Sequence, residues 1–167
     1  VAVIDLDGFK AINDCHGHGA GDEILVQVAR RLEMLPSDEV FCARLGGDEF
    51  ALLVTGDVDN KSLNRLGSRI CQMLGQKYSL SQVDATISAS IGFAVCPEAA
   101  VDAERLLESA DYALMHAKQN HRGSPVLFNA ELGDEMRKLS IIDQHLRNAE
   151  LERELTIMLQ PIVYSDS

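Results

Sequence analysis

The chain has 167 residues, of which 46% are hydrophobic and 25% charged, so we expect one globular domain with at most a fragment of a second. No apolar run approaches the ~20 residues of a membrane helix, so no membrane contact is expected. The formal net charge of −11 disfavours nucleic acid as a partner, because nucleic-acid binding needs a basic face.

The first part of the chain alternates strand-like runs with helical patterns. VAVIDL, residues 1–6, predicts a buried strand that ends in acids, and Asp7 is expected to cap the short helix that follows. Apolar residues at helical spacing predict a longer helix over residues 22–35. The runs VFCARL and DEFALLV are separated by Gly46 and Gly47, which predicts a β-hairpin.

The remaining elements complete the predicted fold. Helical spacing recurs over residues 63–74 and 106–117, while ATISASIGFAVCP and PVLF are strand-like. Strands that alternate with helices around one hairpin predict an α/β (α+β) fold, with helices flanking a mixed central sheet. We expect a domain over residues 1–129, a connector helix over residues 130–155, and the first strand of another domain over residues 156–167.

Two adjacent acids interrupt the apolar hairpin. A two-residue turn would place Arg44 opposite Glu49 and neutralise it, although a functional role for Glu49 is equally open. Alternation would direct Asp48 to the face of Phe50. If the hairpin lies beside the first strand, Asp48 approaches Asp5, and carboxylates ~4 Å apart repel by about 4 kcal/mol at an effective dielectric of about 20. Such a pair favours a bridging Mg²⁺, with an ordinary charged turn as the alternative.

Three stretches, DLDGFKAIND, HGHGAGDEIL and RLGGDEF, follow one another in this order. With them the chain resembles the GGDEF family, the diguanylate cyclases. The resemblance implies a fold similar to nucleotidyl cyclases and polymerase palm domains, with a catalytic hairpin at Gly46 and Gly47. It also implies an enzyme that condenses two GTP into cyclic di-GMP and pyrophosphate, by two-metal catalysis at a homodimer interface.

The resemblance assigns the metal and catalytic residues. Asp5 and Asp48 match the carboxylates that hold two ions, Mg²⁺ or Mn²⁺, with the backbone carbonyl of Leu6 as a further ligand. Asp48 is also expected to help deprotonate the attacking 3′-hydroxyl, and Glu49 matches the adjacent acid of the motif. Asp7 is expected to remain a helix cap.

The resemblance also implies five substrate-binding residues. Asn13 and Asp22 match the family's guanine-reading pair, and His18 lies between them. A carboxylate accepts from guanine N1–H and N2–H₂, a donor pair that adenine lacks, so this pair favours GTP over ATP. Lys118 and Arg122 match a basic pair that receives the phosphates. From the residues alone, a turn role for Asn13, capping by Asp22 and interaction of both cations with a helix dipole stay open.

The chain departs from the family upstream of the hairpin. The RxxD of the family's product-binding site is replaced by SDEV at residues 37–40, so we expect no product feedback there. The tail LTIMLQPIV resembles the first strand of an EAL domain, a cyclic di-GMP phosphodiesterase. We therefore expect a parent protein with an upstream sensor and a downstream EAL domain. Four cysteines without metal-binding spacing suggest a cytoplasmic chain, with an upstream membrane anchor left open.

Two other functions stay open. A GTP-binding regulatory domain with weak catalysis, controlling a downstream EAL phosphodiesterase, would use the same base and phosphate residues. A generic metal-dependent nucleotidyl transferase would use ATP as well as GTP. The intact acids favour catalysis, whereas the EAL-like tail favours regulation.

Overall fold

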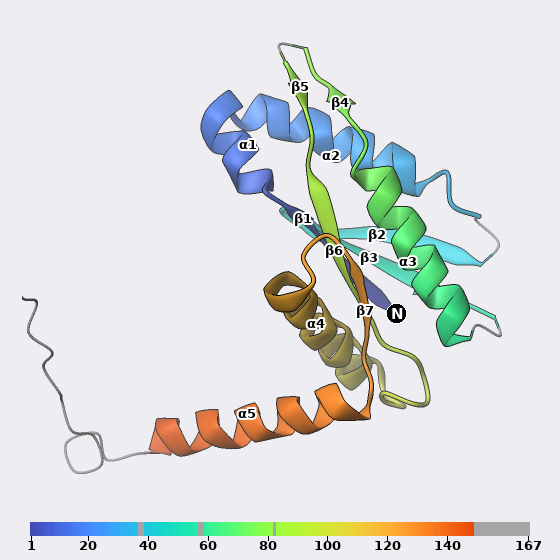
Figure 1. Ribbon diagram of the computed structural model, residues 1–167, viewed down its shortest axis with the longest axis vertical. Coiled ribbons are helices and arrows are strands. Elements are labelled where there is room, and N and C mark those ends of the chain that lie inside the picture. The colour runs from blue at the N-terminus through green and yellow to red at the C-terminus, as the bar shows by residue number, and fades with distance from the viewer. Residues whose placement is uncertain (37–38, 57–58, 82, 149–167) are drawn as a thin grey trace, which may run out of the picture. The chain divides into compact units, whose positions relative to one another are not determined.

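The computed structural model describes residues 1–36, 39–56, 59–81 and 83–148. Its central element is a mixed sheet with the strand order β2-β3-β1-β6-β7 (Figure 1). Only the β6–β7 pairing in this sheet is parallel. The elements in chain order are β1 (Ala2–Asp7), α1 (Phe9–His16), α2 (His18–Leu32), β2 (Val40–Gly46), β3 (Glu49–Val54), α3 (Asn60–Leu74), β4 (Tyr78–Ser79), β5 (Asp84–Ala85), β6 (Ser88–Phe93), α4 (Ala103–Asn120), β7 (Pro125–Leu127) and α5 (Ala130–Asn148).

Strand β1 lies in the middle of the sheet, and all of its residues are buried. Because successive side chains point to opposite faces, Ile4 and Leu6 enter the larger core, whereas Val3 enters a second, smaller core. Helices α2 and α3 supply the larger core and α4 the smaller one. Helices therefore flank both faces of a mixed sheet (Figure 1), which confirms the predicted fold class.

Helix α4 lies directly on β6 because Gly92 has no side chain. A Cβ at Gly92 would stand 2.1 Å from the carbonyl oxygen of Ala110 and 2.2 Å from the backbone nitrogen of Leu114. The helix axis can approach the sheet this closely only at a glycine. This contact fixes the position of α4, and with it the position of Lys118 in its last turn.

A second, two-stranded sheet, β4–β5, is joined to α2 by a series of polar contacts. The contributing side chains of α2 are spaced four residues apart and therefore share one face of the helix. Their partners are backbone groups at alternate positions of the segment that leads through β4. The contacts join Glu23 to Ser81 N, Gln27 to Ser79 O and Arg31 to Lys77 O, at 2.8, 3.0 and 2.7 Å.

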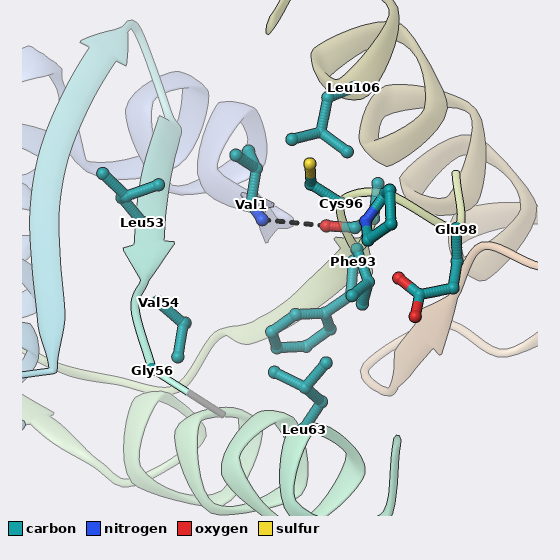
Figure 2. Close-up of a pocket in the computed structure, with 12 residues that line it drawn as sticks. Val1, Leu53, Val54, Gly56, Leu63, Phe93, Cys96, Glu98 and Leu106 are labelled. Atoms are coloured by element: carbon teal, nitrogen blue, oxygen red, sulfur yellow. Dashed lines mark hydrogen bonds between the residues drawn. The ribbon is translucent and has the colours of Figure 1, made fainter. Parts of the chain in front are cut away.

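A pocket of about 340 Å³ lies at the start of β1 (Figure 2). It is lined by side chains from several elements, including Val1, Leu63, Phe93 and Leu106. The backbone nitrogen of Val1 donates to the carbonyl oxygen of Ala94 at 2.8 Å. Most of this lining is apolar, and the pocket lies at the opposite end of β1 from the acids of DLD.

Several predicted bounds differ from the structure. The helix predicted over residues 22–35 is α2 (His18–Leu32), and the short strand β4 was not predicted. Helix α5 begins at Ala130, and its N-terminus is capped by Asn129, whose Oδ1 accepts from Leu132 N at 3.0 Å. The EAL-like tail and residues 149–155 of the predicted connector lie outside the described residues. No helix within the described ranges is long and apolar enough to cross a membrane.

Candidate active site

A cleft of about 420 Å³ opens at the carboxyl end of β1. Gly8, at φ +83°, is the single residue between β1 and α1, and a side chain would be strained in that conformation. The tight connection places the start of α1 at the end of β1, and the β2–β3 turn and the end of α4 complete the lining of the cleft. The charged residues that line the cleft are Asp5, Asp7, Lys10, Asp14, Asp48, Lys118 and Arg122.

The β2–β3 hairpin lies beside β1, which is the condition under which the sequence places Asp48 near Asp5. Asp5 pairs with Glu49 across the two strands, and the backbone nitrogen of Leu6 donates to the carbonyl oxygen of Asp48 at 3.3 Å. Asp5 and Asp48 line the same cleft, and the charge of Asp48 contributes to raising the pKa of Asp5. The structure therefore brings together the two carboxylates expected to share a cation.

The internal register of the hairpin differs from the prediction. Arg44 pairs with Phe50 instead of Glu49, because the register shifts between Arg44 and Gly46. Arg44 donates through Nε and Nη2 to the carbonyl oxygen of Gly47, at 3.1 and 2.8 Å, so it stabilises the turn. The predicted Arg44–Glu49 pair is wrong. Glu49 is exposed and lies opposite Asp5.

The strand alternation from which the orientation of Asp48 was predicted does not extend to this residue. Phe50 is buried in the core between the sheet and α2, whereas Asp48 lines the cleft. Asp48 belongs to the turn that precedes β3, so the alternation of strand side chains does not apply to it. Its position in the cleft depends on the turn beside β1.

Asp5 is bound by a cation from α4. Lys118 Nζ lies 2.6 Å from Asp5 Oδ2, and the Asp5 side chain is only 10% exposed. Burial raises the pKa of Asp5, the bond to Lys118 opposes that rise, and the charges of Asp48 and Asp7 add to it. The positive charge of Lys118 therefore offsets part of the cost of burial and of the repulsion between the acids.

Asp7 has a different environment from the one predicted. The residue before α1 is Gly8, and no side chain caps the helix. Asp7 is the last residue of β1 and lies opposite Ser88 of β6, so the two side chains are neighbours on the same face of the sheet. It accepts from Ser88, Ser90 and Arg122 at 3.0, 2.9 and 2.9 Å. The prediction that Asp7 caps the helix is therefore wrong. It failed because neighbouring residues in the sequence do not indicate that β1 pairs with β6.

The residues expected to read guanine lie on α1 and α2. A Cβ at Gly21 would stand 2.1 Å from Asn13 Oδ1, so the amide of Asn13 lies against the backbone of α2 next to Asp22. Within the described part of the chain, the buried Oδ1 of Asn13 has no hydrogen-bond partner. His18 and Asp22 are exposed in the first half of α2. Their joint contact with a base stays a prediction.

The basic pair reaches the cleft from the end of α4. Lys118 lies in the last turn, but the helix ends at Asn120, so Arg122 follows it in a turn. The i and i+4 spacing would place both on one helix face only if the helix continued to Arg122, and it does not. Both side chains nevertheless point at acids of β1, Lys118 at Asp5 and Arg122 at Asp7.

Sequence reasoning missed four polar residues around the cleft. Lys10 and Asp14 of α1 line it, and their spacing of four residues after the DLDG turn could have indicated a shared face. Ser88 and Ser90 bind Asp7 and alternate along β6 in the same way as Asp5 and Asp7 along β1. Without knowledge that β1 pairs with β6, this matching alternation only weakly indicates that the serines contact Asp7.

The oxygen ligands at this cleft suit a divalent cation. No group of three or more His, Cys, Asp or Glu side chains within the described residues is arranged as a complete metal site. Mg²⁺, however, typically uses one or two carboxylates, substrate phosphates and several waters. The carboxylates of Asp5 and Asp48, with Leu6 beside them in the cleft, fit that pattern. The residues present therefore fit Mg²⁺ or Mn²⁺ bound together with a phosphate ligand.

Comparison with known proteins places this site in a family. The model of the family "Diguanylate cyclase, GGDEF domain" matches residues 1–124. Diguanylate cyclase TpbB of Pseudomonas aeruginosa UCBPP-PA14 is 41% identical over 136 residues, which cover 80% of this chain and 31% of that protein. The bifunctional diguanylate cyclase/cyclic di-GMP phosphodiesterase MucR of Pseudomonas aeruginosa PAO1 is 35% identical over 163 residues, 98% of this chain and 24% of that protein.

Solved structures agree. The GGDEF domain of TpbB (YfiN) from Pseudomonas aeruginosa matches with a TM-score of 0.77 and 36% identity, over 81% of this chain and 80% of that chain. The GGDEF domain of DgcB from Caulobacter crescentus, in complex with c-di-GMP, matches with a TM-score of 0.68 and 28% identity, over 75% of each chain. The chain spans between 20% and 24% of the length of longer relatives, including MucR and the Escherichia coli phosphodiesterase PdeR. The chain belongs to the diguanylate cyclase GGDEF domain family, which confirms the family predicted from its sequence.

Proposed function

We propose that this chain forms cyclic di-GMP from two molecules of GTP, with Mg²⁺ or Mn²⁺, at the interface of a homodimer. The observation that carries the proposal is the cleft at the end of β1, where Asp5 and Asp48 meet Lys118 and Arg122. Nucleotidyl transfer needs carboxylates that bind metal ions and basic side chains that bind phosphates, and the cleft contains both. Each protomer would bind one GTP.

In the proposed reaction, the 3′-oxygen of one GTP bonds to the α-phosphorus of the other. The bond from that phosphorus to the β-phosphate breaks, and pyrophosphate leaves. Asp48 accepts the proton of the 3′-hydroxyl, as its place in the cleft allows. The same step with the two nucleotides exchanged closes the ring.

Metal binding falls to Asp5, Asp48 and the carbonyl of Leu6. Two bound ions would supply charge stabilisation for the attacking and leaving oxygens. Lys118 must leave Asp5 before an ion can take its place, and the released ammonium can then bind the triphosphate. Arg122, which lines the same cleft, would also bind the phosphates. Glu49 lies opposite Asp5 on β3, and we assign it a supporting catalytic role.

Base recognition falls to Asn13, His18 and Asp22. The carboxylate of Asp22 accepts from N1–H and N2–H₂ of guanine, and the amide of Asn13 contacts the base beside it. The Asn13 amide already lies against α2 next to Asp22, which supports this assignment. Discrimination against ATP follows, because adenine lacks both donors.

A second candidate is regulation of an attached phosphodiesterase by bound GTP. Cyclic di-GMP phosphodiesterase PdeR of Escherichia coli K12 is 34% identical over 162 residues, 96% of this chain. A domain similar to this chain is therefore found within a protein named as a phosphodiesterase. The upstream sensor, the downstream EAL domain and the cytoplasmic location stay predictions about the parent protein.

The test is nucleotide turnover by the dimeric protein. Wild-type protein incubated with GTP and Mg²⁺ should yield cyclic di-GMP and pyrophosphate, resolved by liquid chromatography. Asp48→Asn should abolish the product, because it removes both a metal ligand and the group that accepts the proton. Glu108→Gln removes the same charge from an exposed site on α4 and should leave turnover unchanged.

Three results would decide against the proposal. A dimeric, GTP-saturated sample that forms no product contradicts catalysis. GTP that raises phosphodiesterase activity of the parent protein without being consumed identifies the regulatory function instead. Equal use of ATP would indicate a generic nucleotidyl transferase.

A further inference from the structure

Asp7 is a buried carboxylate whose two oxygens are both bonded to the protein. Oδ2 accepts from the hydroxyls of Ser88 and Ser90, at 3.0 and 2.9 Å. Oδ1 accepts from Nε of Arg122 at 2.9 Å, and the Asp7 side chain is only 4% exposed. A buried charge is costly unless it is paired and hydrogen-bonded, and these donors meet both conditions.

Ser90 also connects this carboxylate to the backbone beside Arg122. The backbone nitrogen of Gly123 donates to Ser90 Oγ at 3.0 Å, while the same hydroxyl donates to Asp7. Arg122 is therefore held twice, through its Nε by Asp7 and through the next peptide by Ser90. This matters because Arg122 lies beyond the end of α4, where no helical hydrogen bond fixes it.

The contact with Asp7 leaves most of the guanidinium free. It uses Nε and leaves Nη1 and Nη2, and the Arg122 side chain is 66% exposed at the cleft. Two such nitrogens, in one rigid plane, match the oxygens of a phosphate group. A long side chain that is held in place in advance also loses less conformational entropy when it binds a ligand.

Asp5 and Asp7 therefore differ in role, although they lie two residues apart on the same face of β1. One oxygen of Asp5 binds Lys118, and the Lys118 side chain is 35% exposed at the cleft. Asp7 is surrounded by serine hydroxyls of β6 on the side away from Arg122. A metal ion could bind Asp7 only by breaking its hydrogen bonds to Ser88 and Ser90 or its ion pair with Arg122.

We propose that Asp7, Ser88 and Ser90 are positioning residues that hold the Arg122 guanidinium ready for a triphosphate, and that Asp7 is not a metal ligand. The inference rests on the proposed function, because it takes Arg122 as a phosphate-binding residue. The serines have no charge, so their removal tests the positioning without changing the field at the cleft.

The first experiment measures GTP binding in the presence of Mn²⁺. Ser90→Ala should weaken binding about three- to tenfold, the cost of ordering one long side chain. In an Arg122→Ala background, Ser90→Ala should have no further effect, because the residue that it positions is gone. Ser109→Ala, at a buried serine of α4 outside the cleft, is the matched control and should leave binding unchanged.

A pair of variants at Ser88 separates positioning from loss of fold. Ser88→Ala should weaken GTP binding, and Ser88→Thr, which keeps the hydroxyl, should restore it. Thermal unfolding of each variant is measured alongside. Equal GTP binding by wild type and Ser90→Ala, or an equal loss with and without Arg122, contradicts the inference.

The second experiment measures Mn²⁺ binding without nucleotide, by electron paramagnetic resonance. Asp5→Asn should lose Mn²⁺ binding, whereas Asp7→Asn should retain it. Loss of Mn²⁺ by Asp7→Asn as well contradicts the inference and leaves the proposed function standing. Wild-type protein that binds no GTP contradicts the proposed function and the inference with it.

Discussion

Lys118 Nζ lies 2.6 Å from Asp5 Oδ2, so the carboxylate expected to bind a metal ion already holds a cation of the protein. A divalent ion and Lys118 therefore compete for one oxygen. A nucleotide whose phosphates attract Lys118 removes that competition and strengthens metal binding. By thermodynamic linkage, the metal strengthens nucleotide binding by the same factor.

Lys118→Met should tighten Mn²⁺ binding in the absence of nucleotide, because the competing ammonium is removed. Coupling of this kind typically changes affinity at least about fivefold. The same variant should weaken GTP binding. Titration with Mn²⁺ followed by electron paramagnetic resonance checks the first effect. Lys10→Met removes the same charge from the same cleft and should change Mn²⁺ affinity less, and an equal change in both variants would contradict the competition.

Gly21→Ala should weaken GTP binding without loss of fold. The new Cβ would stand 2.1 Å from Asn13 Oδ1, so the Asn13 amide has to move away from α2. Gly19→Ala is the control, because no atom lies within 4 Å of a Cβ at that position. Calorimetric titration with GTP should separate the two variants, and a Gly21→Ala protein with unchanged affinity would remove Asn13 from the base site.

Asp5→Asn should raise the melting temperature near neutral pH. Burial raises the pKa of Asp5 in the folded state, so the folded protein disfavours the charged form that predominates at neutral pH. Relative to the variant, wild type should therefore lose stability as pH rises from the ordinary Asp pKa of about 3.9 through the raised value. Melting curves across this range check the sign: the difference should vanish at the acid end, and a variant less stable at neutral pH would contradict it.

Gly92→Ala should destabilise the fold strongly. Its Cβ would meet backbone atoms of Ala110 and Leu114 at 2.1 and 2.2 Å, and a helix backbone cannot yield as a flexible side chain can. We expect a loss at or above the upper end of about 1–3 kcal/mol, measured by urea unfolding. Gly46→Ala, with no atom within 4 Å of the added Cβ, should cost far less.

The elements of the fold could largely be predicted because hydrophobic spacing reflects which face each element buries. Strand β1 and helices α3 and α4 follow directly from such spacing. The short strand β4 has too few residues to form a pattern. The hairpin register was missed because the shift between Arg44 and Gly46 depends on contacts within the turn.

The site was predictable where one motif holds the chemistry and less so where distant segments meet. Asp5 and Asp48 were paired from the sequence because a buried carboxylate needs a cation. Arg122 and Lys118 came from the family resemblance, since nothing in their own neighbourhood indicates which acids they contact. The role of Asp7 depends on Ser90, 83 residues further along the chain, which only the β1–β6 pairing brings beside it.

The contacts between α2 and the segment through β4 have one more consequence. Glu23, Gln27 and Arg31 all bind main-chain atoms, so their partners persist whatever side chains occupy positions 77, 79 and 81. Substitutions there should be tolerated, whereas inserting or deleting a single residue would turn the bonded main-chain groups away from α2. We therefore expect the β4–β5 segment to vary in sequence more readily than in length.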